Sequence, residues 1–398
     1  MKYNLKRFLE AQERSYPASV DEFLSHNANL DWYWYVLPIM RGEFGCKKED
    51  LYGISSPEEA TTYINNPILN THLREMTQDL LSYKGNQWNI FSKSFIFKSM
   101  TLFDAISPND IYAQVLDKYF SSDWNAERTL DLLMYHRYAT IDGITYQINI
   151  KKHTALVTRG ENIVYEGDIV IPPMVVFENV IYNVVGIDRF AFFGCSSLKT
   201  IILPLNIISI GDYAFSFCFL LSSIKISRNV SFIGERTFWG CTWLSSIVVD
   251  PANKKYDSRG NCNAIIESET NILISGCKNT IIPNDISIIG PYAFSMNKLV
   301  RKIDIPDSVH TIDQSAFYGC SSLCEIKLPK DLKHIGGLAF GRCTSLLTLK
   351  LPVSLETLHP TAFNNLKPYQ EVWLTKELKE SLCKKKDSML DINILREY

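Results

Sequence analysis

The most constraining feature of this chain is the signature Ala-Phe-x-x-Cys, which returns at a fixed interval through its last two thirds. The numbers of the first residues in its seven successive copies differ by 23, 23, 56, 23, 23 and 23. The copies begin at Ala191, Ala214, Thr237, Ala293, Ala316, Ala339 and Ala362. A period in the twenties is typical of a solenoid, whose units cannot bury an apolar face alone and therefore stack. The spacing favours a binding function, because a solenoid presents an extended surface.

Apolar residues stand seven, ten, twelve and nineteen places after the first residue of each copy. In the copy from Ala316 they are Leu323, Ile326, Leu328 and Ile335. The positions at ten and twelve have the period of a short strand with two inward side chains. A Pro follows in most copies and closes the strand. The Asp-x-Ala-Phe stretch predicts one helical or 3-10 turn, and successive strands are expected to lie about 4.8 Å apart in a parallel sheet.

The one long step, from Thr237 to Ala293, corresponds to two coils and an insertion. Thr270 stands one period before Ala293, and Cys277 follows it in the register of the other coils. Before Thr270, a polar stretch that contains Gly260 leads into an apolar alternation, Ala-Ile-Ile. This pattern predicts a hairpin at about 250–270 that projects from one edge of the solenoid.

The pattern IGxxAFxxCxSLxxIxLPxxLxxI resembles the BspA-type leucine-rich repeats of bacterial and protozoan proteins, over about residues 140–376. The insertion is similar to one that is common in that family, and the segment from Asp142 resembles a strand-rich cap over the first coil. The resemblance implies a leucine-rich-repeat solenoid with such a cap at residues 137–376. The charged helical pattern of residues 377–398 predicts a cap for the last coil.

The segment before the repeats, residues 1–136, carries no repeat and shows helical patterns instead. Four of the seven Trp residues lie here, enough for an independent core, so an all-α domain is expected at residues 1–136. The stretches YNLKRFLEAQ, DWYWYVLPIMRGEFG and VLDKYFSSDWNAERTLDLL resemble a bacterial domain of unknown function that is sometimes labelled calpastatin-like. The helical patterns cover residues 3–13, 20–26, 58–65, 71–82, 110–120 and 126–136.

Polar residues of this domain present two alternatives. Relatives usually carry a basic stretch and His before the Trp-x-Trp unit, where this chain has Ala-Asn-Leu-Asp31, so we interpret its copy as divergent. Asp31, His72 and Arg74 are candidates for a pocket in the N-terminal domain. His72 and Arg74 fit the solvated face of a helix equally well.

Composition and charge argue against several classes of function. The net charge of -2 gives no long-range field toward nucleic acid or an anionic membrane. No run of eighteen apolar residues exists, and the first ten residues become charged too early for a signal peptide. The cytoplasm is therefore the expected location, without membrane insertion, and exported relatives make the cell surface the alternative. Signatures of nucleotide binding, zinc proteolysis and serine hydrolysis are absent, so no enzyme activity, cofactor or metal is predicted.

Five of the ten Cys residues stand four places after the first residue of a copy. Asn297 and Leu366 take this place in two other copies, so we expect a buried slot in which Cys acts as a small hydrophobe. Cys324 stands four residues after a repeat Cys and does not complete a zinc site. The five repeat residues are Cys195, Cys218, Cys241, Cys320 and Cys343.

The outward side of the strands is the expected binding face, because registers nine and eleven point away from the core. The early coils present Ile202, Val248 and Ile281 there, whereas the later coils present charges. Exposed β-branched residues indicate either a partner patch or the ordinary preference of strands for such residues. The candidate binding residues are Ile202, Lys225, Val248, Ile281, Asp304, Lys327 and Lys350.

Two functional hypotheses follow from these patterns. The first is a non-enzymatic scaffold whose solenoid binds an unknown protein. The second is a helical domain that keeps a small-ligand or catalytic pocket, which the solenoid targets to a partner. A closed apolar core around Trp32 and Trp34 favours the first hypothesis, and a cleft in which Asp31, His72 and Arg74 converge favours the second.

Overall fold

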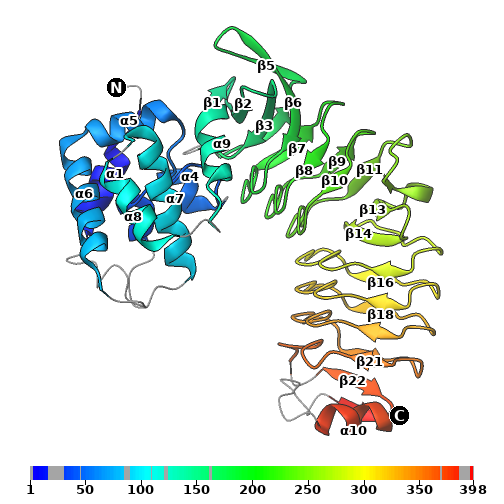
Figure 1. Cartoon of the computed structure of the whole chain (residues 1–398). Coiled ribbons are helices and arrows are strands. Elements are labelled where there is room, and N and C mark those ends of the chain that lie inside the picture. The colour runs from blue at the N-terminus through cyan, green and yellow to red at the C-terminus, as the bar shows by residue number, and fades with distance from the viewer. Residues whose placement is uncertain are drawn as a thin grey trace. The chain divides into compact units, whose positions relative to one another are not determined.

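The computed structural model consists of a helical unit and a solenoid unit (Figure 1). The helical unit comprises Met1–Ala155, Gly160–Asn162 and Val176–Tyr182, and the solenoid unit comprises the rest of the chain. The expected architecture of N-terminal helices followed by a repeat solenoid is confirmed. The structure describes residues 3–16, 31–44, 46–84, 90–108, 110–120, 124–160, 164–367, 370–384 and 395–397.

Most helices of the helical unit agree with the expected patterns. Three of them begin at side chains that accept hydrogen bonds from the first turn: Ser56 accepts from the Glu59 N–H, Asn66 from two backbone N–H groups, and Asp110 from the Ile111 N–H. The pattern at residues 20–26 lies outside the described residues. The helices are α1 (Lys6–Arg14), α3 (Trp32–Val36), α4 (Lys47–Tyr52), α5 (Pro57–Asn65), α6 (Pro67–Ser82), α7 (Ile90–Ile106), α8 (Ile111–Tyr119) and α9 (Glu127–Tyr135).

The helix α7 was not predicted, although it packs against α5, α8 and α9. Its sequence is apolar on nearly all sides, so it lacks the one-sided pattern of an amphipathic helix. Phe95 and Phe103 of α7 are fully buried, and the ring of Trp34 meets Phe95 edge-on with centroids 4.8 Å apart. Trp32 and Trp34 are buried as well. The aromatic residues of this unit therefore form its core, as their number suggested.

A hairpin of β1 (His136–Ile141) and β2 (Ile144–Asn149) also belongs to the helical unit. Asp142 and Gly143 form its two-residue turn with φ of 49° and 79°, the left-handed conformation that such hairpins require. The Tyr138 hydroxyl donates a hydrogen bond to the Arg41 carbonyl oxygen over 3.1 Å. The hairpin is thereby held against the helices.

The solenoid unit is built from short strands, one or two for each coil. Most are two to five residues long, as expected for a chain that turns twice within each period of the repeat. The elements after the first hairpin are β3 (Thr154–Thr158), β4 (Gly167–Val170), β5 (Met174–Phe177), β6 (Val180–Ile187), β7 (Leu198–Ile202), β8 (Ser209–Ile210), β9 (Ser223–Ile226), β10 (Phe232–Ile233), β11 (Ser246–Val249), β12 (Tyr256–Asp257), η1 (Arg259–Asn261), β13 (Ala264–Glu267), β14 (Ile272–Gly276), β15 (Ile288–Ile289), β16 (Lys302–Asp304), β17 (Thr311–Ile312), β18 (Glu325–Lys327), β19 (His334–Ile335), β20 (Thr348–Lys350), β21 (Thr357–Leu358), β22 (Glu371–Leu374), α10 (Lys376–Lys384) and β23 (Leu395–Glu397).

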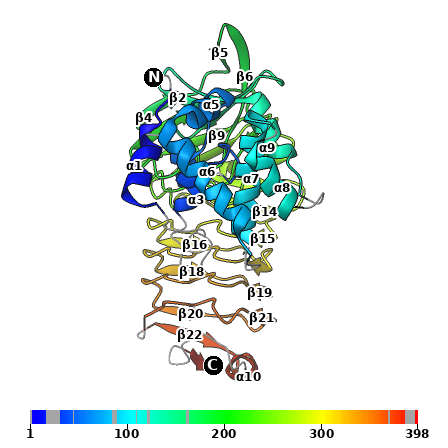
Figure 2. The same ribbon diagram turned by 60° about the vertical axis from the view of Figure 1, so that its left-hand side comes forward.

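Strands from successive coils pair in parallel on two sides of the solenoid unit. One side holds the sheets β4–β7–β9–β11, β16–β18 and β20–β22–β23. The other side holds the parallel runs β6–β8–β10 and β14–β15–β17–β19–β21. Figure 2 shows β16, β18, β20 and β22 along one side and β19 and β21 along the other. The tail contains the helix α10, and its strand β23 pairs with β22, so the edge of β22 is covered.

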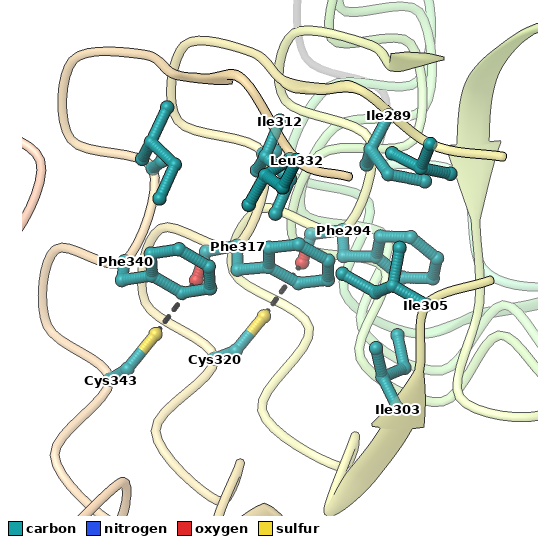
Figure 3. Close-up of a cluster of buried hydrophobic side chains, with 14 of the residues drawn as sticks. Ile289, Phe294, Ile303, Ile305, Ile312, Phe317, Cys320, Leu332, Phe340 and Cys343 are labelled. Atoms are coloured by element: carbon teal, nitrogen blue, oxygen red, sulfur yellow. Dashed lines mark hydrogen bonds between the residues drawn. The ribbon is translucent and has the colours of Figure 1, made fainter. Parts of the chain in front are cut away.

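Side chains of the repeat form ladders through the core (Figure 3). Phe317 is fully buried, and its ring stacks 5.1 Å from that of Phe294 and 5.5 Å from that of Phe340. The Sγ atom of Cys320 donates a hydrogen bond to the Phe294 carbonyl oxygen, and Cys343 donates to that of Phe317. The same bond recurs in the early coils. Cys therefore fills a small apolar slot and also satisfies a buried backbone carbonyl.

The Asp-x-Ala-Phe stretch forms turns whose N–H groups bond to carbonyl oxygens three residues earlier, as in a 3-10 turn. In one coil, the N–H of Ala316 donates to the Asp313 carbonyl oxygen over 3.2 Å. Ser315 within this segment and Gly319 just after it have φ of 54° and 71°, in the left-handed region. These two residues redirect the backbone, so the segment rounds a corner of the coil and does not continue as a helix.

The insertion forms the expected hairpin. β13 pairs antiparallel with β12 and with β14, and β14 then pairs in parallel with β15. Cys277 and Ile282 are buried, which confirms the register assigned to the coil that begins at Thr270. In the coil that begins at Thr270, β14 lies where the other coils have the Ala-Phe turn. The interruption of the repeat is therefore also an interruption of the Phe ladder.

Candidate functional site

The outward side of β4, β7, β9 and β11 carries a row of residues that we call the early face: Val170, Ile202, Lys225 and Val248. Val170 pairs with Ile202, and Val248 pairs with Lys225. The strands β7 and β9 are joined in the same register two residues earlier. Val170, Ile202 and Val248 are 62, 60 and 43 % exposed. The sheet therefore presents three apolar side chains and one Lys in a row at the surface.

Strand alternation explains why these apolar side chains are exposed. Ile201, Ile224 and Ile247 each precede a residue of the early face, and they are buried. Because successive side chains of a strand point to opposite sides, the residue after each of them must face outward. The Thr200 hydroxyl donates to the Asp168 carboxylate over 2.6 Å, so hydroxyl and acidic groups border the row.

The structure does not place Ile281 on the same sheet. Its side chain is 75 % exposed, but its backbone N–H donates to the Cys262 carbonyl oxygen of the insertion over 3.0 Å. The Val249 N–H donates to Ser258 of the same insertion. Residues of the insertion thus pair with both coils, and Ile281 is separated from the row that contains Ile202 and Val248.

The later coils present a different surface, which we call the late face: Asp304, Lys327 and Lys350. All three side chains are exposed, and Asp304 pairs with Lys327 in the register of β16 and β18. Lys302 forms an ion pair with Glu325 across the same two strands, with 2.5 Å between Nζ and Oε1. Opposite charges directly across two strands stabilise the pair modestly. The late face is therefore charged and partly neutralised within itself.

A shallow groove borders the early face, and sequence reasoning missed it. Leu220 and Trp243 line it and are 41 and 53 % exposed, and the Lys278 ammonium lies 5.0 Å from the centroid of the Trp243 ring. Lys199 lines the groove as well. Trp243 stands six places after the start of its copy, where three other copies carry Ser. This departure from the repeat was the available signal.

Val170 of the early face was also missed. It lies in the cap segment, before the first copy of the repeat, so no register predicted that β4 would extend the sheet. Strand pairing between a non-repeating segment and the first coil depends on tertiary contacts that the repeat pattern does not contain.

In the helical unit, the three candidate pocket residues have separate partners. Asp31 forms an ion pair with Lys48. Arg74 forms an ion pair with Asp110, with 2.7 Å between Nη1 and Oδ2, and this contact lowers the pKa of the Asp110 carboxyl. His72 has other partners, Gln12 and Tyr16. The structure therefore gives no contact that brings Asp31, His72 and Arg74 together.

His72 belongs to a network that joins three helices. Its Nδ1 atom lies 2.7 Å from the Gln12 side-chain oxygen, and its ring stacks on that of Tyr16 with centroids 4.3 Å apart. The Gln12 amide nitrogen donates to the Tyr35 carbonyl oxygen over 2.5 Å. These contacts give His72 a packing role between α1, α3 and α6.

Charged side chains inside the helical unit are paired with one another. Arg7 and Glu59 form an ion pair of 2.7 Å with both side chains almost fully buried, and Glu59 also accepts from the Ser55 N–H over 2.8 Å. The buried Glu43 carboxylate contacts the Lys98 ammonium. Buried charges are tolerated when they are paired and hydrogen-bonded in this way.

Comparison with protein families follows the division into two units. The model of the BspA type leucine rich repeat region matches residues 177–269 and 264–381 in six copies, which together span half of the chain. The chain belongs to the BspA-type leucine-rich repeat family. Residues 2–133 match the model of a protein of unknown function, DUF1810. Both matches agree with the resemblances drawn from the sequence. A comparison with curated proteins gives no significant match.

Several solved structures resemble parts of this leucine-rich repeat chain. A leucine rich cell surface protein from Faecalibacterium prausnitzii is 20% identical over 65% of this chain and 93% of its own, with a TM-score of 0.37. A leucine-rich repeat protein from Bacteroides capillosus is 31% identical over 31% of this chain and 88% of its own, with a TM-score of 0.28. A conserved hypothetical protein from Mycobacterium tuberculosis is 30% identical over 33% of this chain and 98% of its own, with a TM-score of 0.31.

Among the described residues, no three His, Cys, Asp or Glu side chains are grouped so that they could hold a metal ion. Within the same residues, no helix is both long enough and apolar enough to cross a membrane.

Proposed function

We propose that this chain is a non-enzymatic protein-interaction scaffold and that its early face binds the partner. The observation that carries the proposal is the row of exposed β-branched side chains at Val170, Ile202 and Val248, which lie on adjacent or nearly adjacent strands. Burying apolar surface contributes about 25 cal/mol per Å² to association. Removing this apolar row from water on partner binding is therefore favourable.

The groove beside the early face supplies an anchor for such an interface. Trp is enriched among the residues that dominate binding energy, and Trp243 is half exposed at the edge of the sheet. Lys199 and Lys278 border Leu220 and Trp243 there. An apolar centre with a charged rim is the arrangement that many protein interfaces share.

The late face supports a secondary role. Its side chains are charged and solvent-exposed, so they influence how fast a charged partner arrives more than how tightly it is held. The early face provides affinity in this proposal, and the late face modulates the association rate.

The helical unit is assigned a structural role. The separate partners of Asp31, His72 and Arg74 support this assignment over a ligand or catalytic pocket. The paired charges in its interior support it as well, since groups that perform catalysis usually keep a free reacting atom.

A reducing compartment such as the cytoplasm suits the cysteines of this chain. Cys324 is exposed and unpaired, and Cys241 and Cys343 are buried and unpaired. Exposed free thiols are retained in reducing compartments and are oxidised outside them. Cell fractionation of the source organism tests this location, and recovery in the secreted or surface fraction would contradict it.

The binding proposal is tested with a double variant, Ile202→Asp with Val248→Asp, in the full chain. Both side chains face solvent, so the unfolding midpoint and circular dichroism are expected to stay unchanged. We expect the variant to capture at least about tenfold less partner from a lysate of the source organism, because two charges must be desolvated. Quantitative mass spectrometry of the captured proteins provides the measurement.

The control makes two substitutions on the late face, Lys327→Glu with Lys350→Glu. We expect this variant to capture the same partner, with a changed dependence of the association rate on salt. Equal capture by the wild type and by the double Asp variant, with both folded, would remove the binding site from the early face.

A further inference from the structure

The solenoid unit contains a cavity of about 250 Å³ where the repeat is interrupted. The parallel run β6–β8–β10 ends at β10, and the next parallel run begins at β14. The Phe ladder is interrupted at the same place, between the coils of Phe238 and Phe294. The cavity lies between these two coils and is lined by residues of both and of β14.

The insertion explains why the two coils do not close on each other. In the other coils, the N–H of the repeat Phe donates to the next coil, as Phe215 does to Thr237 over 2.9 Å. At the interruption, the Ala293 carbonyl oxygen accepts instead from the Gly276 N–H over 2.9 Å. Gly276 is packed so tightly on Phe294 that an added Cβ would lie 2.2 Å from the ring. The end of β14 thus keeps the coils apart at Ala293 and leaves a space beside it, while the Gly240 N–H still donates to the Ser295 carbonyl oxygen over 3.4 Å.

Two polar atoms at this cavity lack a hydrogen-bond partner. Asn297 lines the cavity with a 5% exposed side chain, and its Oδ1 atom accepts no hydrogen bond. It stands at the repeat position where four Cys residues each donate to a Phe carbonyl oxygen. Asn297 therefore places a hydrogen-bond acceptor without a donor at a position where the Cys of other coils makes a hydrogen bond. Such a buried acceptor is unfavourable unless a ligand supplies the donor.

Arg236 provides the second unpartnered atom. Its terminal nitrogens donate to the hydroxyl groups of Tyr213 and Tyr292, and its guanidinium carbon lies 3.8 Å from the centroid of the Tyr292 ring. The Nε atom is buried and has no acceptor. No carboxylate pairs with Arg236 in the part of the chain that the structure describes. A guanidinium that is oriented by two neutral hydroxyls and lacks a counter-charge is suited to receive an anionic group.

The remaining lining sets the size and character of the ligand. Ile233, Phe238, Ile272 and Phe294 give the cavity an apolar wall, and Glu235 and Glu267 line it as well. An engineered cavity of about 150 Å³ holds benzene. A space somewhat larger than that accommodates a ring or a branched chain together with one or two small polar groups.

We propose that this cavity binds a small carboxylic acid that has an apolar body and a hydrogen-bond donor, the chemistry of an apolar α-amino acid. The carboxylate accepts from Arg236, the ammonium group donates to Asn297 Oδ1, and the apolar side chain lies against the Ile and Phe wall. This site is separate from the early face, so the proposal does not depend on partner binding there.

The test is isothermal titration of the full chain with L-phenylalanine, L-leucine and L-isoleucine. We expect at least one of them to bind, and its analogue without the ammonium or without the carboxylate to bind about tenfold more weakly or worse. For L-phenylalanine these analogues are 3-phenylpropanoate and phenethylamine. Failure of all three amino acids to bind at about 10 mM would overturn the proposal.

Two variants locate the site. Arg236→Gln removes the charge, and Asn297→Cys restores the residue of the repeat; each is expected to weaken binding about tenfold or more. Asn297→Cys is expected to fold at least as well as the wild type, so it decides the outcome if Arg236→Gln proves unstable. Arg228→Gln removes a cation that pairs with Asp250 and lies outside the lining, and it should bind normally. Unchanged affinity in Asn297→Cys would contradict the proposal.

Trp239 offers a local readout, because it lines the cavity and its indole N–H donates to Ser295 over 3.0 Å. With 5-fluorotryptophan incorporated, ¹⁹F NMR resolves the seven Trp residues, and Trp239→Phe identifies the relevant resonance. The ligand is expected to shift the Trp239 resonance most. A shift confined to other Trp residues would place the ligand elsewhere and overturn the assignment.

Discussion

The early and late coils of the solenoid have the same kind of core packing and present two different surfaces. In the early coils, the stacked Phe rings lie 5.1 and 5.6 Å apart, and in the late coils they lie 5.1, 5.5 and 5.8 Å apart. On the outward side, Ile202 and Val248 of the early coils are replaced in the late coils by charges such as Asp304 and Lys327. Inward positions specify how a coil stacks, and outward positions are free to differ.

The difference teaches where function is encoded in a repeat protein. An outward side chain can change without disturbing the core, because the neighbouring residue on the strand carries the packing. An apolar outward residue is therefore not required for the packing of the core. This difference is the basis of our proposal that the early coils bind the partner and the late coils mainly extend the stack.

The first prediction concerns the stacked Phe rings that both regions contain. Phe215→Ala in the early coils and Phe317→Ala in the late coils are each expected to lower the free energy of unfolding by about 3–5 kcal/mol, because both rings are fully buried between two others. Urea unfolding provides the measurement. Phe219→Ala is the control, since its ring is 41% exposed and its loss should have a much smaller effect.

Equal losses of unfolding free energy for the two core variants would show that Phe stacking stabilises both regions to the same extent. A loss confined to one of them would break the comparison, because it would mean that the two regions are packed to different extents and unfold separately.

The helical unit offers a contrast with both regions, because its core contains a buried ion pair. Glu59→Ala leaves the Arg7 guanidinium buried without a counter-charge, and we expect a loss of about 3–5 kcal/mol. Glu58→Ala at the adjacent position removes an exposed partner of Arg137 and should cost less than about 1 kcal/mol. Similar unfolding midpoints for the two variants would show that the Arg7–Glu59 pair contributes little.

The repeat register predicted the solenoid almost completely. The spacing of Phe317, Leu323 and Ile335 required one buried stripe for each coil, and all three side chains are buried. Alternation along the strands likewise predicted that Ile202 and Val248 face solvent. Both predictions rest on the fixed period, because each coil must stack on neighbouring coils that have the same spacing of apolar residues.

What the sequence could not predict lies where the period is lost. The parallel pairing of β4 with β7, the separation of Ile281 from the early face, and the cavity at Arg236 and Asn297 all depend on non-repeating segments. The helix α7 was missed because an apolar sequence without a polar side shows no helical period. Tertiary contacts decide these features.

A second comparison of the early and late coils uses one buried thiol from each, Cys241 and Cys343. Burial raises the pKa of both Cys241 and Cys343 from 9.0 to about 12. A raised pKa in the folded state means that the contribution to stability is complete below pH 9 and is lost as the pH rises toward 12. We expect the double variant Cys241→Ala with Cys343→Ala to show a smaller loss of stability than the wild type over this range.

Alkylation adds a direct measurement. In the folded protein at pH 8, iodoacetamide is expected to label the exposed Cys324 and to leave Cys241 and Cys343 unmodified, because they are buried as neutral thiols. Mass spectrometry of the digested protein identifies the labelled sites. Labelling of only one buried thiol at the rate of Cys324 would show that the two regions are not equally closed.

The central claim is that the early face, and not the late face, is the partner-binding surface. Photocrosslinking tests it most directly, with p-benzoylphenylalanine placed singly at positions 202, 248, 327 and 350 of the full chain. We predict that positions 202 and 248 crosslink to the same protein in cells of the source organism and that positions 327 and 350 give little of that product. A shared product from 327 and 350 without one from 202 and 248 would contradict the account.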